Sequence, residues 1–113
     1  QSGLTMLKEP LQIYSGSSST TFNSFFRNKA MLYNILVSAP NSNGYGYVKL
    51  YNPNQAVPTT ITNGNADLTV RTVGTSANQV GTSRTECSTG SAGTVGAIYS
   101  GNNYGVNIVG WRR

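Results

Sequence analysis

Hydrophobic and polar residues alternate with a period of two along most of this chain, a pattern typical of β-strands with one buried face. The strongest example is the segment 31–38, where Tyr33 and Ile35 belong to an apolar set that alternates with a second, largely apolar set. A strand that is apolar on nearly both faces is predicted to lie in the middle of a sheet. Weaker or shorter alternations predict further strands at 11–13, 45–51, 57–62, 68–73, 84–88, 94–100 and 104–111.

Turn-forming residues separate the predicted strands at intervals of about ten residues. Asn43-Gly44 and Asn63-Gly64 are pairs that tight hairpins prefer, and Ser100-Gly101-Asn102-Asn103 forms a further turn. Pro58 lies inside one short strand segment, which places that strand at a sheet edge. Many short strands with regular turns predict an all-β fold, an antiparallel β-sandwich or small barrel of about seven or eight short strands.

One segment departs from this pattern. Phe22, Phe25 and Phe26 lie at helical spacing after Thr20, so at most one short helix is predicted, near residues 20–30. A loop that inserts its Phe side chains into the core explains the same spacing. Residues 1–19 contain a proline and a run of serines, which predict a lead-in segment or linker. Residues 20–113 are predicted to form a single β domain.

Charge is scarce and dispersed along the sequence. Charged residues make up 10% of the 113 residues, against about 25% in a typical globular protein. Eight Lys and Arg against three acids give a formal net charge of +5, but only Arg112 and Arg113 are adjacent. This dispersal argues against a nucleic-acid site, which needs basic residues gathered on one surface. The apolar runs are far too short to cross a bilayer, so no membrane insertion is expected.

The residue types that most enzymes need are largely missing. The chain has no His, a single Cys and only three acids, Glu9, Asp67 and Glu86. These numbers exclude Ser–His and Cys–His catalysis, His-based acid–base chemistry and structural zinc or iron–sulfur sites. No glycine-rich phosphate-binding motif precedes a predicted helix. We therefore expect a non-catalytic protein with no metal or cofactor, in which Cys87 is a buried thiol.

Tyr and Asn residues gather near the predicted turns and suggest a binding surface. Tyrosine offers a rigid amphipathic ring at low entropy cost, and asparagine offers adaptable hydrogen bonds. Flat aromatic faces suit the C–H groups of sugars, and planar amides suit their hydroxyls. Tyrosines on one strand face also fit a core or a subunit contact. The predicted ligand-binding residues are Tyr45, Tyr47, Tyr51, Asn102, Asn103 and Tyr104.

From Met31 to Arg113 the chain is rich in Asn, Ser, Thr, Gly and Tyr, poor in charge and cysteine, and divided into short predicted strands. In these respects it resembles the distal receptor-binding or knob domains of tailed-bacteriophage tail fibres and tail spikes. The resemblance implies a homotrimer that binds a host cell-surface glycan or protein and is carried on the virion after assembly in the host cytoplasm. A charge-poor β surface with free edges also favours self-association.

Two other interpretations fit the sequence. The chain could be a purely structural module that decorates a capsid or caps a fibre. It also fits a bacterial carbohydrate-binding module, which would be extracellular and part of a larger enzyme. Binding to host glycans or cells separates attachment from a structural role, and the parent chain would identify a module cut from an enzyme.

Overall fold

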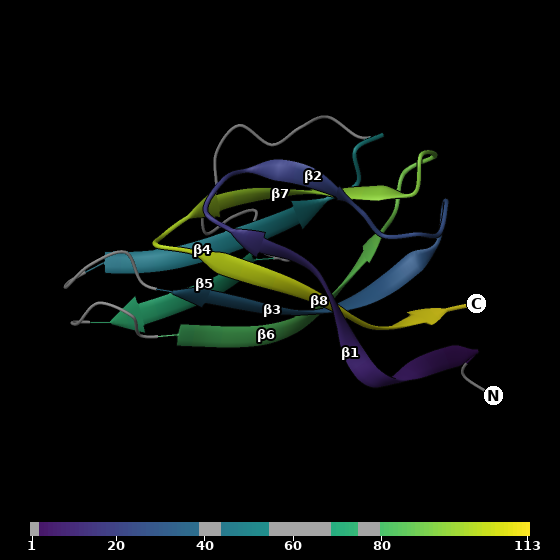
Figure 1. Ribbon diagram of the computed structural model, residues 1–113, viewed down its shortest axis with the longest axis horizontal. Helices are drawn as coiled ribbons and strands as arrows, with labels where there is room; N and C mark the ends of the chain where they lie inside the picture. Colours follow the sequence, from purple (N-terminus) through teal and green to yellow (C-terminus); the bar gives the residue numbers. More distant parts are fainter. Residues whose placement is uncertain (1–2, 39–43, 55–68, 75–79) are drawn as a thin grey trace.

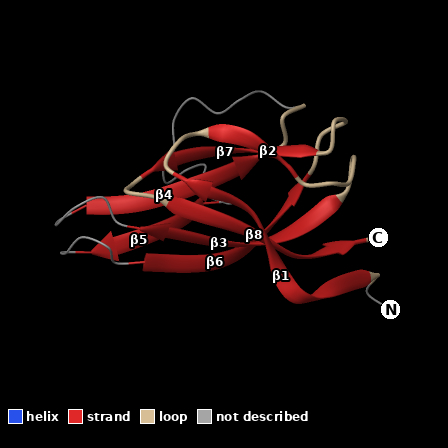
Figure 2. Cartoon of the chain, viewed as in Figure 1, coloured by secondary structure: helices blue, strands red, loops and turns tan. Residues whose placement is uncertain are grey.

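Eight β-strands form the regular structure of the described part of the chain, and none of these residues is helical (Figure 2). The computed structural model describes residues 3–38, 44–54, 69–74 and 80–113. The predicted edge strand at 57–62 and the acid Asp67 lie outside these ranges. The strands are β1 (Leu4–Gly16), β2 (Thr20–Asn23), β3 (Ala30–Ser38), β4 (Gly44–Tyr51), β5 (Thr69–Gly74), β6 (Val80–Ser88), β7 (Thr94–Ser100) and β8 (Tyr104–Arg112).

The strands form two four-stranded sheets that lie on each other as two layers (Figure 1). Sheet A has the strand order β1-β8-β3-β6, and sheet B has the order β2-β7-β4-β5. Every neighbouring pair in both sheets is antiparallel. The predicted all-β antiparallel fold is confirmed, and it takes the form of a small β-sandwich.

The core lies between the two sheets and consists of alternate residues of the inner strands. Along β3, every second side chain from Met31 to Val37 is at most 1% exposed. This strand lies between β8 and β6, so its predicted central position is confirmed. Val48 and Leu50 meet it from β4, and Val95 meets it from β7. Burying each such aliphatic side chain stabilises the fold by roughly 1.5–3 kcal/mol.

The predicted helix near residues 20–30 is absent, and the Phe residues are divided between core and surface. Residues 20–23 form β2, which pairs with β7 and buries Phe22. The backbone N–H of Phe25 donates to Asn23 Oδ1 at 2.8 Å, a side-chain turn that ends the strand in place of helical hydrogen bonding. Phe25 and Phe26 are 58% and 39% exposed, so their helical spacing does not reflect one buried face.

Two segments with weak sequence signals are strands of sheet A. The predicted lead-in segment or linker contains β1, an edge strand that pairs with β8. The register shifts between Met6 and Leu11, around Pro10. This irregularity interrupts the period-two alternation, so the sequence pattern does not predict the whole strand. At the opposite edge, β6 pairs with β3 over all nine of its residues, whereas the sequence predicts only 84–88. The inner-face positions in the first half of β6 are small or polar (Gly81, Ser83 and Thr85), as are most outer-face positions, so the alternation there is faint.

Candidate binding site

The six predicted ligand-binding residues do not gather on one surface. Tyr104, at the start of β8, is buried in the core, where its ring stacks on Tyr99 and Tyr14 with centroid distances of 4.7 and 5.1 Å. Its hydroxyl donates to the Ser18 carbonyl oxygen at 2.8 Å. Burial also raises the pKa of Tyr104 above its ordinary value. The ring therefore completes the core, and it does not offer the open face that the sequence predicts.

The predicted tyrosines of β4 belong to sheet B. Tyr47 and Tyr51 alternate with buried core residues, so they lie on the outer face of that sheet. Tyr51 pairs with Gly96 of β7, and its ring occupies the space that a side chain at Gly96 would need. Tyr51 therefore has a structural role, which is to cover Gly96. Tyr47 lies on the same face and makes no ring contact with the described residues. The side chain of Tyr45 lies outside the described residues.

The turn between β7 and β8 is fixed to the end of β3. The Asn102 N–H donates to the Ser38 carbonyl oxygen at 3.1 Å, and the Ser38 N–H donates to the Asn103 carbonyl oxygen at 2.9 Å. The side chains of both asparagines are exposed. Asn103 borders a cleft on sheet A, which Tyr104 also lines. The structure therefore brings two of the six predicted residues to the same cleft.

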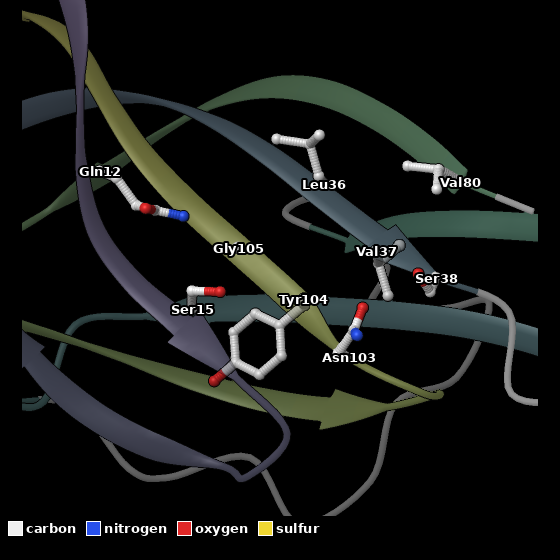
Figure 3. A pocket seen from close by; sticks show the side chains of 9 residues that line it. All are labelled: Gln12, Ser15, Leu36, Val37, Ser38, Val80, Asn103, Tyr104 and Gly105. Atoms are coloured by element: carbon white, nitrogen blue, oxygen red, sulfur yellow. The ribbon is translucent and has the colours of Figure 1, made fainter. Parts of the chain in front are cut away.

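This cleft lies on the outer face of sheet A and has a volume of about 240 Å³ (Figure 3). Gly105 of β8 pairs with Ser15 of β1 and Leu36 of β3, and its missing side chain leaves a gap between them. Leu36 and Val80 supply apolar surface, and neighbouring amides and hydroxyls supply polar groups. The lining residues are Gln12, Ser15, Leu36, Val37, Ser38, Val80, Asn103, Tyr104 and Gly105.

Beside the cleft, four planar polar side chains cross sheet A from edge to edge. The strand register pairs Gln12 with Asn107, Asn107 with Asn34, and Asn34 with Arg84, one residue from each strand. Cross-strand partners share a face, and the buried neighbours of Asn34 and Asn107 show that this face is the outer one. We call these four residues the polar row. Three strand spacings give it a length of about 14 Å.

None of the four side chains in the polar row forms a hydrogen bond or ion pair within the part of the chain that the structure describes. Asn34 and Asn107 are half-buried among their neighbours, while Gln12 and Arg84 at the two ends are exposed. Each amide has two N–H donors and a carbonyl acceptor. The row therefore presents unused donors and acceptors in one line, next to a cleft.

The polar row is absent from the predicted binding residues, which all lie in or near predicted turns. A usable signal was present, since asparagine is depleted in β-strands and yet Asn34 and Asn107 each lie within a strongly apolar strand pattern. Their alignment depends on how β8 pairs with β3, and no local pattern determines that register. Gln12 and Arg84 carry no comparable signal, because each lies on an edge strand that the sequence predicts only in part.

A second polar cluster lies where the loops after β2, β4 and β6 meet. The hydroxyls of Ser24 and Tyr33 form a buried hydrogen bond of 2.7 Å. Thr89 Oγ1 accepts from the Lys29 N–H at 3.0 Å, and the Thr89 carbonyl oxygen accepts from Asn52 Nδ2 at 3.4 Å. We call these five residues the loop-end network. Their polar groups partner one another, so this cluster holds the loops together and offers little to a ligand.

The described residues contain neither a cluster suited to a metal ion nor an exposed thiol. No group of three or more His, Cys, Asp or Glu residues is placed there to hold a metal ion. Cys87 is buried, as predicted, and burial raises the pKa of its thiol to about 11.

No helix among the described residues has the length and apolar character needed to cross a membrane. Comparisons with protein-family models, curated proteins and solved structures found no match to this chain.

Proposed function

We propose that this chain is a non-catalytic recognition domain that binds a carbohydrate on the outer face of sheet A. The observation that carries the proposal is the polar row, whose four side chains have no partner among the described residues. Buried polar groups in proteins usually have hydrogen-bond partners, so an external partner would satisfy the half-buried amides of Asn34 and Asn107. Sugar hydroxyls both donate and accept, which matches the donors and acceptor of each amide.

The cleft supplies the apolar part of the proposed site. Leu36 and Val80 give surface for sugar C–H groups, and Gly105 leaves the space that a ring would enter. Its volume of about 240 Å³ is below the range of roughly 300–1,000 Å³ typical of sites that enclose a drug-sized ligand. We therefore place one sugar ring in the cleft and the rest of an oligosaccharide along the polar row.

The compositional resemblance to phage fibre tips supports a biological setting for this activity. In that setting the ligand is a host cell-surface glycan, the protein is carried on the virion, and three copies assemble as a trimer. An open site of this size binds weakly by itself. Several linked copies would raise the effective affinity through avidity.

The first experiment blocks the cleft without disturbing the fold. A Cβ at Gly105 would lie 3.6 Å from Gln12 Nε2 and 3.7 Å from the Tyr14 carbonyl oxygen, which are ordinary contacts. Gly105→Leu should therefore fold while filling the space that the sugar ring needs. We expect the wild-type protein to bind a subset of glycans on an array and Gly105→Leu to lose at least tenfold in affinity.

Thr21→Leu is the matched control, because Thr21 is exposed on β2 in the other sheet and receives a leucine of the same size. It should bind as the wild type does. A wild-type protein that binds no glycan or host cell would overturn the proposed function. Equal binding by the wild type and Gly105→Leu would remove the cleft from the site.

A second candidate function is a structural module that assembles with other copies of itself. The edge strand β1 favours it, because Leu4, Met6 and Leu11 are 37–47% exposed there. Apolar side chains along a free sheet edge promote association unless they are covered. Light scattering measures the mass directly. A monomer at micromolar concentration excludes this candidate, and an oligomer that Met6→Lys dissociates supports it.

A further inference from the structure

The outer face of sheet A contains an ion pair between Arg112 and Glu86. Arg112 Nε donates to Glu86 Oε1 at 2.8 Å, and both side chains are partly exposed. Glu86 lies on β6 and Arg112 lies on β8, so the pair reaches across β3. The contact occupies the acid that lies nearest to the polar row along β6.

Arg84 is the one cation of the polar row. It is exposed at one end of the polar row, and its guanidinium has no partner among the described residues. Glu86 lies two residues further along β6 on the same face, close enough to compete for Arg84 if it were free. Because Arg112 already holds Glu86, the Arg84 guanidinium can turn its N–H donors toward a ligand.

We infer that the glycan bound by the polar row is acidic, with a carboxylate or sulfate group that pairs with Arg84. This inference rests on the proposed function. A guanidinium binds two oxygens of a carboxylate or sulfate through parallel N–H donors, which adds geometric selectivity to charge attraction. The amides of Asn34 and Asn107 then bind the hydroxyls of the neighbouring rings. The Glu86–Arg112 pair acts as a positioning device that keeps Arg84 available.

The first test uses matched pairs of glycans that differ only in the acidic group: sialylated and desialylated, glucuronate- and glucose-terminated, sulfated and unsulfated. We expect the protein to prefer the acidic member of at least one pair by tenfold or more, and the preference to shrink in high salt. The carboxylate and sulfate pairs separate the two sources of charge. Equal binding to both members of every pair, with binding retained, overturns this inference alone, whereas no binding at all overturns the proposed function.

Arg84→Gln should abolish the preference for the acidic member, so that both members of each pair bind with equal affinity. Arg84→Lys should keep charge attraction but recover only part of the preference, because an ammonium group lacks the planar fork. Lys8→Gln is the matched control, since it removes one exposed cation from β1 outside the polar row. An equal loss in Lys8→Gln and Arg84→Gln would reduce the effect to net charge and overturn the assignment.

A second set of variants tests the positioning role of the ion pair. Arg112→Ala frees Glu86 to bind Arg84, so we expect a loss of acidic preference of at least threefold. Arg112→Ala combined with Glu86→Gln removes the competitor and should restore the preference. Glu86→Gln alone should keep it. A double variant that stays as weak as Arg112→Ala would show that Arg112 acts by its own charge or by folding, and would overturn the positioning role.

Discussion

The polar row consists of Gln, Asn and Arg side chains, and the loop-end network consists of Ser, Thr, Tyr, Asn and Lys residues; the two polar clusters differ in how their polar groups are used. In the loop-end network, Ser24 bonds to Tyr33, and Thr89 bonds to the backbone of Lys29. In the polar row, four side chains lie in line with no partner among the described residues. The presence of polar side chains does not by itself separate structure from recognition, because the distinction lies in which groups are already hydrogen-bonded.

The comparison indicates how to separate structure from recognition in a charge-poor β protein. A buried hydroxyl with a partner contributes stability, and removing that partner leaves a polar group without solvent or hydrogen bond. A half-exposed amide without a protein partner contributes little to stability, and its N–H donors and carbonyl acceptor are available to a ligand. The two clusters should therefore respond oppositely to mutation, with stability changing at one and binding at the other.

The largest expected effect is the response of the interior to alkaline pH. Burial raises the pKa of Cys87 from its ordinary value of 9.0 to about 11, so the unfolded chain releases this proton before the folded protein does. Stability is therefore unaffected by this group below pH 9 and falls as the pH rises from about 9 to 11. At 1.36 kcal/mol per pKa unit, the loss is roughly 2–3 kcal/mol.

Urea unfolding at a series of pH values measures this loss, and Cys87→Val is the control that removes the titrating group. The pKa of buried Tyr33 is raised as well, so a further decline should continue above its ordinary value of 10.0. The three amides of the polar row do not titrate, so they are unaffected by this change. A stability curve that stays flat from pH 9 to 11 in the wild type would contradict the burial of the thiol.

Ser24→Ala should have the next largest effect, because it leaves the buried Tyr33 hydroxyl without its partner. We expect a loss of roughly 1–3 kcal/mol in the free energy of unfolding. The combined variant Ser24→Ala and Tyr33→Phe removes both hydroxyls, so its loss should be smaller than the sum of the two single losses. Ser83→Ala, at an exposed position of the edge strand β6, is the control and should change stability by less than about 0.5 kcal/mol. Strictly additive losses would show that the two hydroxyls do not depend on each other.

The sequence predicts the fold better than it predicts the candidate site, and the reason is physical. Buried alternation is a local property, so 31–38 reveals both a strand and its central position. The aromatic signal is ambiguous, because a ring is equally suited to a ligand and to a core. Tyr104 and Tyr51 are predicted as platforms, yet one fills the core and the other covers Gly96. Burial of this kind depends on residues far away in the sequence.

The polar row is hidden from sequence analysis for a related reason. Asn34 and Asn107 are 73 positions apart in the sequence, by the numbering, and become neighbours only through the pairing of β3 with β8. The prediction of a helix near 20–30 is wrong for a different reason. The Phe spacing is a real local pattern, but the hydrogen bond from the Phe25 N–H to Asn23 forms a turn there instead of a helix. Local signals predict elements, and the register between elements determines which residues meet.

Asn34→Ala tests whether the polar row contributes to binding and not to stability. The Asn34 side chain has no described partner, so its removal should change the free energy of unfolding by less than about 0.5 kcal/mol. If the polar row binds a glycan, the same variant should weaken binding by tenfold or more. Thermal unfolding and glycan titration on one preparation provide both readouts. A loss of more than about 2 kcal/mol with unchanged binding would place Asn34 with the loop-end network instead.

The smallest expected effect concerns Phe25, which follows Ser24 of the loop-end network and has an unusual backbone conformation. Its φ is 72°, in the left-handed region that is unfavourable by roughly 1–2 kcal/mol per residue for side chains that cannot bond locally. Asparagine tolerates this region, and Phe25 is 58% exposed, so Phe25→Asn removes little buried surface. We expect a stability gain of no more than about 1 kcal/mol, measured by urea unfolding.

The sign of the Phe25 effect depends on the network beside it. Ser24 is fixed by Tyr33 and by its own N–H bond to the Gly93 carbonyl oxygen at 2.7 Å, so the backbone entering position 25 cannot relax. In the Ser24→Ala background part of this restraint is gone, and Phe25 can move toward an ordinary φ. The gain from Phe25→Asn should then shrink. An undiminished gain in that background would show that the turn at Asn23, and not the loop-end network, imposes the strained conformation.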